Sequence, residues 1–531
     1  METYPFGSSR RILKRIHSNL SMELQFSPLP LLFTFLLFFL FMFLKKGKRP
    51  KPQNPTSKLP PGPWKLPIIG NMHQLLGPLP HQTLRDLAQK HGPLMHLCLG
   101  EISTIVVTSP AVAKDVLKTH DLNFANRPQP LSAKIFTYDC TDIAFAPYGE
   151  YWRQLRKICA LELLSTKRVE SFQYLREEEA SNLIRSIYDE TDSPINFTQK
   201  IMSMTNNIIA RAAFGKKNKD QEKFLSALRE TVKLAGGFYF ADLFPSWKSL
   251  HFLSRMKSQM EIVHRKMDEV FDNIIEDHRQ KVTAVQTTRD GSESKVEDLV
   301  DVLLRIQQHR ELGFPITTDN IKGVIYDIFI GGTETSSATL EWAMAEMMKN
   351  PRVMEKAQGE VRQAINGKEK VDVRDSEKLE YLKLVIKETL RLHPPLALLV
   401  QRECRERCEI DGYEIPEKTR VIVNAWAIGR DPRNWDDAES FKPERFDGSS
   451  IDYKGYNFEF IPFGAGRRIC PGMTFGLANL VYPLALLLYH FNWKLPSGME
   501  PEDLDMTETF GASVTKRNNL YLHAFPLNSF A

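Results

Sequence analysis

The strongest limit on the fold of this chain is a run of nineteen residues, 26–44, that contains no charged side chain. As a helix, the run is about 28 Å long, close to the thickness of the hydrocarbon core of a bilayer. It is followed at once by five basic residues, Lys45, Lys46, Lys48, Arg49 and Lys51. By the positive-inside bias, these residues place the remainder of the chain in the cytosol. We therefore expect a single membrane-spanning helix near the N-terminus.

The N-terminal region allows two alternatives to this interpretation. A cleaved signal peptide is the first, but the apolar run is longer than usual and no small-residue cleavage site follows it. Residues 1–21 carry four basic side chains on the side that an anchor would place in the lumen. A start at Met22 would leave these residues out, so we expect the working protein to begin there. The second alternative is a basic, acid-poor targeting leader.

The chain divides by composition into four segments. Residues 1–21 form a basic extension, 22–44 the membrane anchor, 45–67 a basic and proline-rich strap, and 68–531 the main body. Seven prolines lie between positions 50 and 67. This density prevents a regular helix and favours a stiff, extended strap. No linker divides the main body, so we expect one large domain.

Composition and charge exclude several classes of protein. The 531 residues include 70 Lys and Arg against 65 Asp and Glu, a net charge of +5. With 25% charged and 42% hydrophobic residues, the chain is not largely disordered, and its charge gives no basis for nucleic-acid binding. Its six cysteines are too few for a disulfide framework and indicate a reducing, cytosol-facing compartment.

Hydrophobic periodicity predicts a main body that is mainly α-helical with small β-sheets. Amphipathic helical patterns dominate, and short strand-like runs occur near residues 94–107 and 413–422. The stretch 277–297 is polar and contains Gly291. It is predicted to be a solvent-exposed loop.

The strongest chemical signal is the segment 463–472, which contains Cys470. A thiolate that ligates iron needs a lowered pKa, amide donors near its sulfur and a backbone that approaches the cofactor closely. Glycines permit this approach because they have no Cβ. The segment has three at suitable spacing, Gly464, Gly466 and Gly472. A buried structural cysteine is the alternative interpretation.

The neighbours of Cys470 fit the same role. Phe463 can pack beside a cysteine ligand, and Arg468 can reach a carboxylate at the edge of a cofactor. The apolar run 473–488 predicts a helix that begins just after Cys470. The dipole at that helix N-terminus favours an anion.

A second signal lies in a predicted helix of thirty-two residues, Thr318–Lys349. Thr318 or Asp319 can cap its start, and Asn350 and Pro351 end it. At roughly 48 Å, it would cross the whole domain.

The centre of this helix carries the sequence from Gly331 to Ser336. The adjacent glycines Gly331 and Gly332 each cost about 1 kcal/mol relative to alanine, so they predict a groove for something that lies against the helix. Glu334 and Thr335 then place an acid and a hydroxyl beside the groove, the parts of a proton relay. A capping or packing role is the alternative.

Two further motifs combine arginine with a polar partner. Glu388 and Arg391 lie on one helix face, and Arg445 can supply a second guanidinium, which we interpret as a structural network. Trp152 and Arg156 stand at i, i+4 and can clamp a carboxylate. An ordinary amphipathic helix with a surface arginine is the alternative for this second motif.

These four motifs stand in the order and spacing of the cytochrome P450 family, which the chain resembles from about Met22 to its C-terminus. The proline strap after an anchor is similar to that of microsomal members. The whole set resembles the large plant branch that hydroxylates terpenoids, alkaloids and phenolics. The resemblance implies the cytochrome P450 fold and a haem-thiolate catalytic domain over 68–531.

The resemblance also implies the roles of individual residues. Haem b is expected to be ligated by the Cys470 thiolate, with Phe463 guarding the sulfur and Gly472 beside the cofactor. Its propionates are expected to bind Trp152, Arg156 and Arg468. The remaining residues have two implied roles: proton delivery by Glu334 and Thr335, and a fold-stabilising triad of Glu388, Arg391 and Arg445.

The implied partners follow from this activity. A monooxygenase of this kind uses O2 and takes electrons from NADPH through NADPH–cytochrome P450 reductase. It is held in the endoplasmic reticulum membrane by its single N-terminal helix, with the catalytic domain in the cytosol. The basic residues Arg153, Lys157 and Arg467 are expected to meet an acidic flavin domain of the reductase.

The sequence constrains the substrate less than it constrains the cofactor. The pocket regions of the family correspond here to 124–147, the neighbourhood of 238–240, 396–400 and 510–512. The last two are apolar and offer no cation or amide to orient a charged ligand. We therefore expect a neutral hydrophobic substrate, a sesquiterpene or a diterpene, in preference to an alkaloid or a flavonoid.

The chain departs from the pattern of the plant branch at two positions, and two remote alternatives to a monooxygenase exist. Glu334 replaces the commoner Asp, and Gln401 stands where the branch usually has Pro. One alternative is a reductase-independent haem-thiolate isomerase or dehydratase, against which Thr335 and the uninterrupted segment 463–472 argue. The other is a non-catalytic haem-binding protein, which would need neither Glu334 nor an apolar pocket.

Overall fold

The computed structural model of the chain describes Phe33 and the residues that follow: 58–217, 221–237, 239–247, 255–287, 297–309, 314–365 and 372–527. The contacts separate residues 1–57 from one compact unit, Lys58–Ala531. The basic extension, the predicted anchor apart from Phe33, and the strap up to residue 57 lie outside the described residues.

The compact unit is mainly helical with small sheets, as predicted. Its helices are α3 (Pro80–His91), α4 (Pro110–Lys114), α5 (Leu131–Phe136), α6 (Glu150–Glu162), α7 (Thr166–Ser171), α8 (Gln173–Tyr188), α9 (Phe197–Phe214), α10 (Gln221–Ala235), α11 (Phe240–Leu243), α12 (Arg255–Thr287), α13 (Leu299–His309), α14 (Thr318–Lys349), α15 (Pro351–Ile365), α16 (Val373–Ser376), α17 (Glu380–Leu392), α18 (Ala425–Ile428) and α19 (Met473–His490). Short turns of other helix types are η1 (Met72–Leu75), η2 (Asp115–Thr119), η4 (Pro443–Phe446), η5 (Gly466–Arg468) and η6 (Pro501–Asp503).

The strands form four small sheets. They are β1 (Leu94–Leu99), β2 (Ile102–Val107), β3 (Ile195–Asn196), β4 (Arg402–Glu403), β5 (Cys408–Ile410), β6 (Tyr413–Ile415), β7 (Arg420–Val423), β8 (Phe491–Lys494), β9 (Glu508–Phe510), β10 (Val514–Lys516) and β11 (Tyr521–Pro526). The largest sheet has the order β1-β2-β7-β4, with β2 and β7 parallel. The others are β3-β11-β8 and the antiparallel pairs β5-β6 and β9-β10. The strand-like runs near 94–107 and 413–422 are therefore confirmed.

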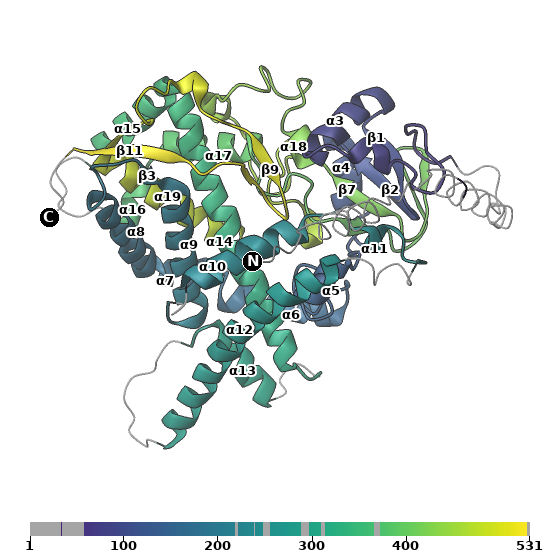
Figure 1. The fold of residues 1–531 in the computed structure, drawn as a ribbon, viewed down its shortest axis with the longest axis horizontal. Coiled ribbons are helices and arrows are strands. Elements are labelled where there is room, and N and C mark those ends of the chain that lie inside the picture. The colour runs from purple at the N-terminus through teal and green to yellow at the C-terminus, as the bar shows by residue number, and fades with distance from the viewer. Residues whose placement is uncertain are drawn as a thin grey trace, which may run out of the picture. The chain divides into compact units, whose positions relative to one another are not determined.

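Helix α14 lies at the centre of the unit and positions much of the site. It runs between the sheet β1-β2-β7 with α3 and α4 on one side and the helices α8, α9 and α19 on the other (Figure 1). It begins and ends as predicted, but its cap is Thr317, whose side chain accepts from the Asn320 N–H while the Asn320 side chain accepts from Thr317. This reciprocal pair satisfies two amide groups at once, which neither Thr318 nor Asp319 does.

The prediction of a loop over residues 277–297 is wrong for the first half of this stretch. Helix α12 continues to Thr287, and residues 288–296 lie outside the described residues. The stretch 277–287 is polar but rich in Arg, Gln, Lys and Ala, which favour a helix. Polarity alone therefore does not distinguish a loop from a helix in this stretch.

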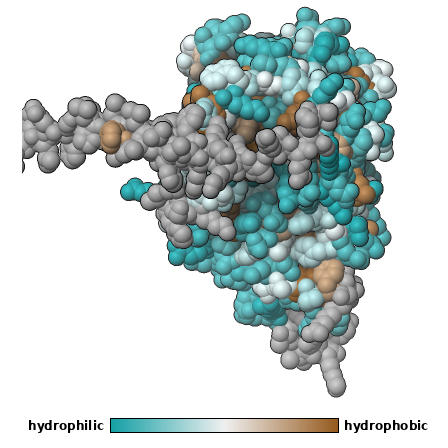
Figure 2. Space-filling model, turned by 90° about the vertical axis from the view of Figure 1, so that its right-hand side faces the viewer, coloured by the Kyte–Doolittle hydropathy of each residue, from teal (hydrophilic) through white to brown (hydrophobic). Residues whose placement is uncertain are grey.

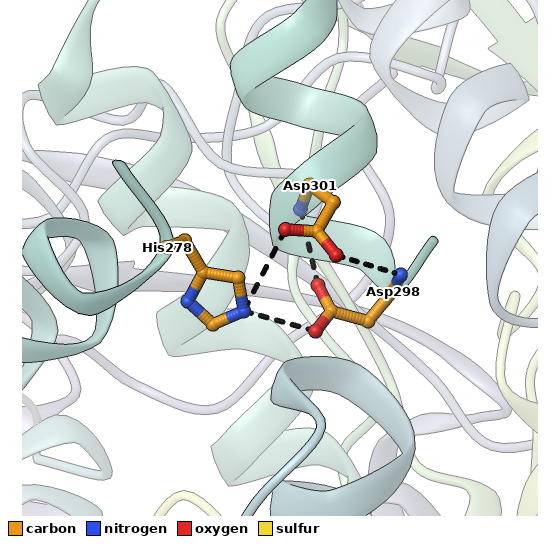
Figure 3. Close-up of side chains that lie close together, drawn as sticks. All are labelled: His278, Asp298 and Asp301. Atoms are coloured by element: carbon orange, nitrogen blue, oxygen red, sulfur yellow. Dashed lines mark hydrogen bonds and ion pairs between the residues drawn. The ribbon is translucent and has the colours of Figure 1, made fainter. Parts of the chain in front are cut away.

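A buried histidine joins α12 to the start of α13 (Figure 3). His278 Nε2 lies 2.9 Å from Asp298 Oδ2 and 4.0 Å from Asp301 Oδ1, and its Nδ1 contacts the Ile274 carbonyl. Asp298 Oδ1 in turn accepts the N–H groups of Val300 and Asp301. The three side chains thus form the N-terminal cap of α13, with every nitrogen of His278 engaged by a neighbour.

Helix α19 is the one described helix long and apolar enough to cross a membrane, and more than half of it is buried inside the protein. It belongs to the core, because it packs against α8, α14, α15 and α17. The face of the molecule seen in Figure 2 is mainly hydrophilic, with apolar residues in small separate groups. All six cysteines lie in the described residues, and none of them forms a disulfide there.

Candidate functional site

Cys470 ends a tight loop at the N-terminus of α19. Its N–H donates to the Phe463 carbonyl at 3.0 Å, which closes the loop 463–470. Within the loop, Gly464 and Gly466 adopt φ values of +69° and +71°. Only glycine takes this left-handed conformation without strain, so the loop folds as it does because of these two residues.

The three glycines of segment 463–472 are needed for different physical reasons. A Cβ on Gly466 would overlap the Leu117 carbonyl oxygen, so this glycine permits close packing of the loop on η2. Gly472 has an ordinary φ of −89°. A Cβ there would lie 3.9 Å from Cys470 Sγ, so Gly472 keeps the space beside the sulfur free.

The protein alone does not make Cys470 a thiolate. Burial raises the pKa of the Cys470 thiol, while the Gly472 amide and the charge of Arg156 oppose this effect only in part. A coordinated metal ion removes the proton of a thiol outright, so deprotonation here depends on ligation.

Phe463 is half-buried beside this loop. Its ring meets the Tyr453 ring edge-to-face, with centroids 5.7 Å apart. This contact fixes the loop against the rest of the core.

The predicted carboxylate-binding residues lie together on the other side of the loop. Arg468 donates to the carbonyls of Ala125 at 2.8 Å and Ala146 at 2.6 Å. Its guanidinium stacks 4.1 Å from the centre of the Trp152 ring. Arg156 donates to the carbonyl of residue 469 at 2.5 Å. Trp152 itself donates to the carbonyl of residue 143 at 2.9 Å.

The structure adds two buried arginines that the sequence analysis missed. Arg127 donates to the carbonyls of Ala144, Val400 and Gln401, the last at 2.7 Å. Arg402 donates to the Ala465 carbonyl at 2.8 Å and pairs with Asp121 at 3.2 Å. The position of Arg127 inside the predicted pocket stretch 124–147 was the one available signal, because arginines are rarely buried without a partner.

We call Arg127, Arg156, Arg402 and Arg468 the arginine cluster. Burial and repulsion by other arginines lower the pKa values of Arg127, Arg402 and Arg468. The pKa of Arg402 falls to about 10 and that of Arg468 to about 9. The pKa of Arg156 is lowered by burial alone. Among the described residues, no carboxylate forms an ion pair with Arg127, Arg156 or Arg468, and Asp121 pairs with Arg402.

This excess of buried positive charge is costly unless an anionic group compensates it. A group that carries two carboxylates would do so through charge-assisted hydrogen bonds. The cluster lies against a loop that presents one cysteine sulfur, and the residues present therefore fit a haem with a thiolate ligand and two propionates.

The middle of α14 passes close to the start of α19. A Cβ on Gly476 of α19 would lie 4.0 Å from Ser336 Oγ, and no atom lies within 4 Å of the position of a Cβ on Gly331. The helix is therefore open to space at Gly331. Thr335, one turn farther on, is partly exposed, and its hydroxyl donates to the Gly331 carbonyl at 2.6 Å.

Glu334 does not share this open face. Its side chain is buried, and its Oε1 accepts from Ser513 Oγ at 3.1 Å, while Oε2 has no partner among the described residues. Burial raises the pKa of Glu334, although Ser513 and Arg229 oppose the effect. The hydroxyl and the acid therefore point to different surroundings, because consecutive residues of a helix face different directions.

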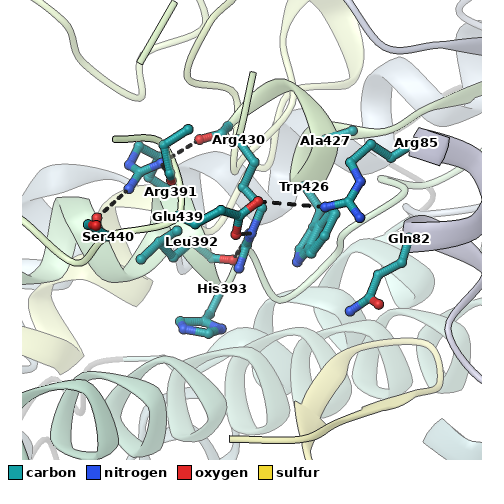
Figure 4. Close-up of polar contacts among 12 residues, drawn as sticks. Gln82, Arg85, Arg391, Leu392, His393, Trp426, Ala427, Arg430, Glu439 and Ser440 are labelled. Atoms are coloured by element: carbon teal, nitrogen blue, oxygen red, sulfur yellow. Dashed lines mark hydrogen bonds and ion pairs between the residues drawn. The ribbon is translucent and has the colours of Figure 1, made fainter. Parts of the chain in front are cut away.

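The three residues expected to form a structural network are in contact. Arg391 makes a bidentate pair with Glu388, with both N–O distances 2.7 Å, and Arg445 Nε lies 2.9 Å from Glu388 Oε1. Arg391 also donates to carbonyls, including that of Ser440, and the neighbouring Arg430 donates to that of Leu392 (Figure 4). These bonds satisfy the buried charges and join α17 to the segment around η4.

The four predicted pocket stretches also meet. Arg127 ties 124–147 to 396–400 through the Val400 carbonyl. The Leu131 N–H donates to Asp242 next to 238–240, although residue 238 itself lies outside the described residues. The Ala512 N–H donates to the Val232 carbonyl, and the Val514 N–H to that of Pro395.

Comparison with known proteins identifies the class to which this fold and site belong. The family model of cytochrome P450 matches residues 60–524, so the chain belongs to this family. The fold is also similar to that of a zebrafish cytochrome P450 solved with abiraterone, with a TM-score of 0.70 and 25% sequence identity. This match covers 85% of the present chain and 100% of the other. The protein is a cytochrome P450 monooxygenase.

Several plant proteins are similar over nearly their full length. Desmethyl-deoxy-podophyllotoxin synthase of Sinopodophyllum hexandrum is 58% identical, covering 94% of this chain and 97% of its own. Premnaspirodiene oxygenase of Hyoscyamus muticus and 5-epiaristolochene 1,3-dihydroxylase of Nicotiana tabacum are each 55% identical. Each of these two matches covers 95% of this chain and 99% of the relative.

Proposed function

We propose that the protein is an NADPH-dependent haem-thiolate monooxygenase that hydroxylates a neutral hydrophobic plant metabolite, a sesquiterpene or a diterpene. The observation that carries this proposal is the arginine cluster beside the Cys470 loop. It brings four arginines, of which only Arg402 has an ion-pair partner among the described residues, next to a thiol at a helix N-terminus. That combination suits a single group that carries an iron ion and two carboxylates.

Each residue of the site has a proposed role toward haem b. Cys470 would ligate the iron through its thiolate, with Phe463 and Gly472 beside the sulfur. The propionates would bind Arg468, Arg156 and Trp152, which would exchange backbone carbonyls for carboxylates as partners. When bound, a thiolate-ligated haem supplies the activation of O2 and the oxidation of a C–H bond.

Proton supply is the proposed role of Thr335 and Glu334. Thr335 Oγ1 lies at the open face of α14, where it can hold a water and pass a proton into the space beside Gly331. Glu334 has a raised pKa and an Oε2 without a hydrogen-bond partner among the described residues, so it can hold a proton in reserve on another face of the helix. A proton from Glu334 would have to travel around the helix through water, because its carboxyl group contacts Ser513.

Electrons are proposed to come from NADPH–cytochrome P450 reductase. Arg153, Lys157 and Arg467 are exposed on α6 and on the Cys470 loop, and they form the docking surface in this proposal. Reversing the charge of Lys157 and Arg467 should slow reduction and weaken its dependence on salt. An unchanged reduction rate would contradict this docking surface.

The relatives bear on the substrate. Two are named for premnaspirodiene and 5-epiaristolochene, which are sesquiterpene hydrocarbons, and this supports a terpene substrate. A third is named for a podophyllotoxin-type product, an oxygenated aromatic compound, so an aromatic substrate such as an alkaloid or a flavonoid is the second candidate. The apolar residues of 396–400, among them the buried Ala397 and Leu398, favour the hydrocarbon.

Two experiments test the proposed function. The reduced protein with carbon monoxide should show the absorption band of a thiolate-ligated haem, and Cys470→Ser should lose it. Microsomes that contain the protein and a reductase should then convert a terpene hydrocarbon in an NADPH-dependent way, with products identified by mass spectrometry. Turnover of aromatic compounds alone would replace the first candidate substrate with the second.

We further propose that residues 22–44 anchor the protein in the endoplasmic reticulum membrane and that translation begins at Met22. The charge-free run and the basic residues after it support this location. N-terminal sequencing of the native protein tests the start, since a peptide that spans Arg15 and Met22 would contradict it.

A further inference from the structure

The segment 142–146 lies between a carboxyl group of α14 and the arginine cluster. On one side, Asp327 Oδ2 of α14 accepts the N–H of Ile143 at 2.6 Å and that of Ala144 at 3.0 Å. On the other side, the carbonyls of residues 143, 144 and 146 accept hydrogen bonds from Trp152, Arg127 and Arg468. Part of the hydrogen bonding of Arg127 and Arg468, two members of the arginine cluster, therefore depends on how firmly Asp327 holds this segment.

A second carboxyl group meets Asp327. Asp142 is fully buried, and its Oδ1 accepts the Phe145 N–H at 3.1 Å. Its Oδ2 is buried and has no hydrogen-bond partner among the described residues. Asp142 directly precedes Ile143, whose N–H Asp327 accepts, so the two carboxyl groups lie near enough to interact. Such a contact requires a proton, because two adjacent carboxylates repel strongly in a buried site.

A proton between the two carboxyl groups would give Asp142 Oδ2 the partner that it lacks. Asp327 Oδ2 is occupied by two N–H groups, so Asp327 Oδ1 is the oxygen left to share the proton with Asp142 Oδ2. Burial raises the pKa of both groups, to about 6 for Asp142 and well above the usual range for Asp327. These raised pKa values favour retention of one proton by the pair, which is lost as the pH rises.

No titratable group around Asp142 and Asp327 takes the place of the proton between them. The groups that interact with the pair are Tyr151, Tyr326, Cys140, Cys159, Arg127 and Arg468. The phenols and thiols are neutral at pH 7, because burial raises their pKa values. The two arginines attract Asp142 but donate to backbone carbonyls, so neither bridges the two acids.

We propose that Asp142 and Asp327 share one proton and form a carboxyl latch that holds segment 142–146 against α14 and so helps to position Arg127 and Arg468 of the arginine cluster. Both are positioning residues, since they act through the peptide groups of 143–146. Loss of the proton would set two carboxylates against each other and release the N–H groups of Ile143 and Ala144. The link from the latch to haem rests on the proposed function of the arginine cluster.

Gly323 shows how closely this region packs on α14. It lies one turn before Asp327, and a Cβ on it would stand 3.4 Å from Thr141 Oγ1 and 3.6 Å from the Asp142 nitrogen. The residues just before the latch therefore rest directly on the helix. Opening of the latch must move them away from it.

Hydrogen exchange of the peptide that contains Ile143 and Ala144 tests the latch without reference to haem. Exchange of the full chain is measured from pH 6 to pH 10 and divided by the intrinsic rate at each pH. We expect protection to fall at least tenfold in alkaline solution. Asp327→Asn mimics the protonated acid, since its amide oxygen accepts and its NH2 donates, so this variant should stay protected throughout.

Two further variants complete the test. Asp327→Ala removes the acceptor of both N–H groups and should leave the peptide unprotected at every pH. Asp189→Asn, at an exposed acid after α8, should show the wild-type profile. Identical profiles for the wild-type protein and Asp327→Asn would overturn the latch, whether or not Asp327→Ala folds.

Haem retention tests the link to the arginine cluster. Transfer of haem from the holoprotein to apomyoglobin, followed by absorbance, should be at least tenfold faster in alkaline solution for the wild-type protein but not for Asp327→Asn. If hydrogen exchange supports the latch but the wild-type protein and Asp327→Asn transfer haem at equal rates, only the link between the latch and haem binding is overturned. A protein that never binds haem would refute the proposed function and leave the exchange result to decide the latch.

Discussion

Thr335 is the residue at which the site's chemistry can be tested most directly. Its hydroxyl donates to Gly331 and stands at the only glycine of α14 whose surroundings are open within the described residues. Removing it in Thr335→Ala should lower product formation by roughly 10²-fold, the usual contribution of a positioned proton donor. The measurement is product per unit time in reductase-supplemented microsomes.

Thr339→Ala is the matched control for this variant. Thr339 lies one turn farther along α14, is buried, and donates to the Thr335 carbonyl at 2.8 Å. It has the same local hydrogen bond but no access to the open face. Unchanged oxidation by Thr335→Ala would contradict the proposed role of this hydroxyl in proton supply.

At the scale of elements, Glu388 on α17 shows what a buried ion pair contributes. Glu388→Ala would leave Arg391 and Arg445 without their shared carboxylate in the core. Such an uncompensated charge costs about 3–5 kcal/mol, so the melting temperature should fall clearly. Glu380→Ala on the same helix removes only an exposed pair with Lys383 and should change stability by less than about 1 kcal/mol.

Gly466 of the Cys470 loop can be compared in the same way with Gly448, which lies outside the loop. Gly448 and Gly466 both have positive φ, but only a Cβ on Gly466 would overlap a backbone atom, the Leu117 carbonyl oxygen. Gly448→Ala should cost about 1–2 kcal/mol from its left-handed conformation alone. Gly466→Ala should cost more and lower haem content, as measured by thermal melting and by haem absorbance per mole of protein. Equal effects would show that packing on Leu117 does not matter.

At the scale of the whole molecule, pH dependence of stability follows from His278. Burial alone would lower the pKa of His278, but its contacts with Asp298, the Ile274 carbonyl and Asp301 raise it on balance. A histidine with a raised folded pKa adds stability that is fully present below the unfolded pKa of about 6.5. This stability is lost as the pH rises through the folded pKa.

His278→Gln should therefore lower the melting temperature more at pH 6 than at pH 8.5. His309→Gln, at an exposed position at the end of α13, is the control and should have little effect at either pH. A larger loss for His278→Gln at pH 8.5 would show that the neutral imidazole, rather than its charged form, holds α12 to α13.

Local rules predicted several elements correctly. Asn350 and Pro351 ended α14 at the expected residue because caps and prolines act through neighbouring backbone groups. The fold class followed from hydrophobic periodicity, which depends on spacing alone. The same rules failed at 277–287, where a polar sequence with good helix formers continues α12.

The amino-acid sequence by itself determined the family, the cysteine loop and the course of the central helix, because each depends on residues close together in the chain. Only the tertiary structure brought Arg127 and Arg402 beside Arg468, turned Glu334 away from the open face of α14, and joined Asp142 to Asp327. The reason is physical: burial and pairing of charges depend on segments up to hundreds of residues apart, and no local pattern records which of them meet.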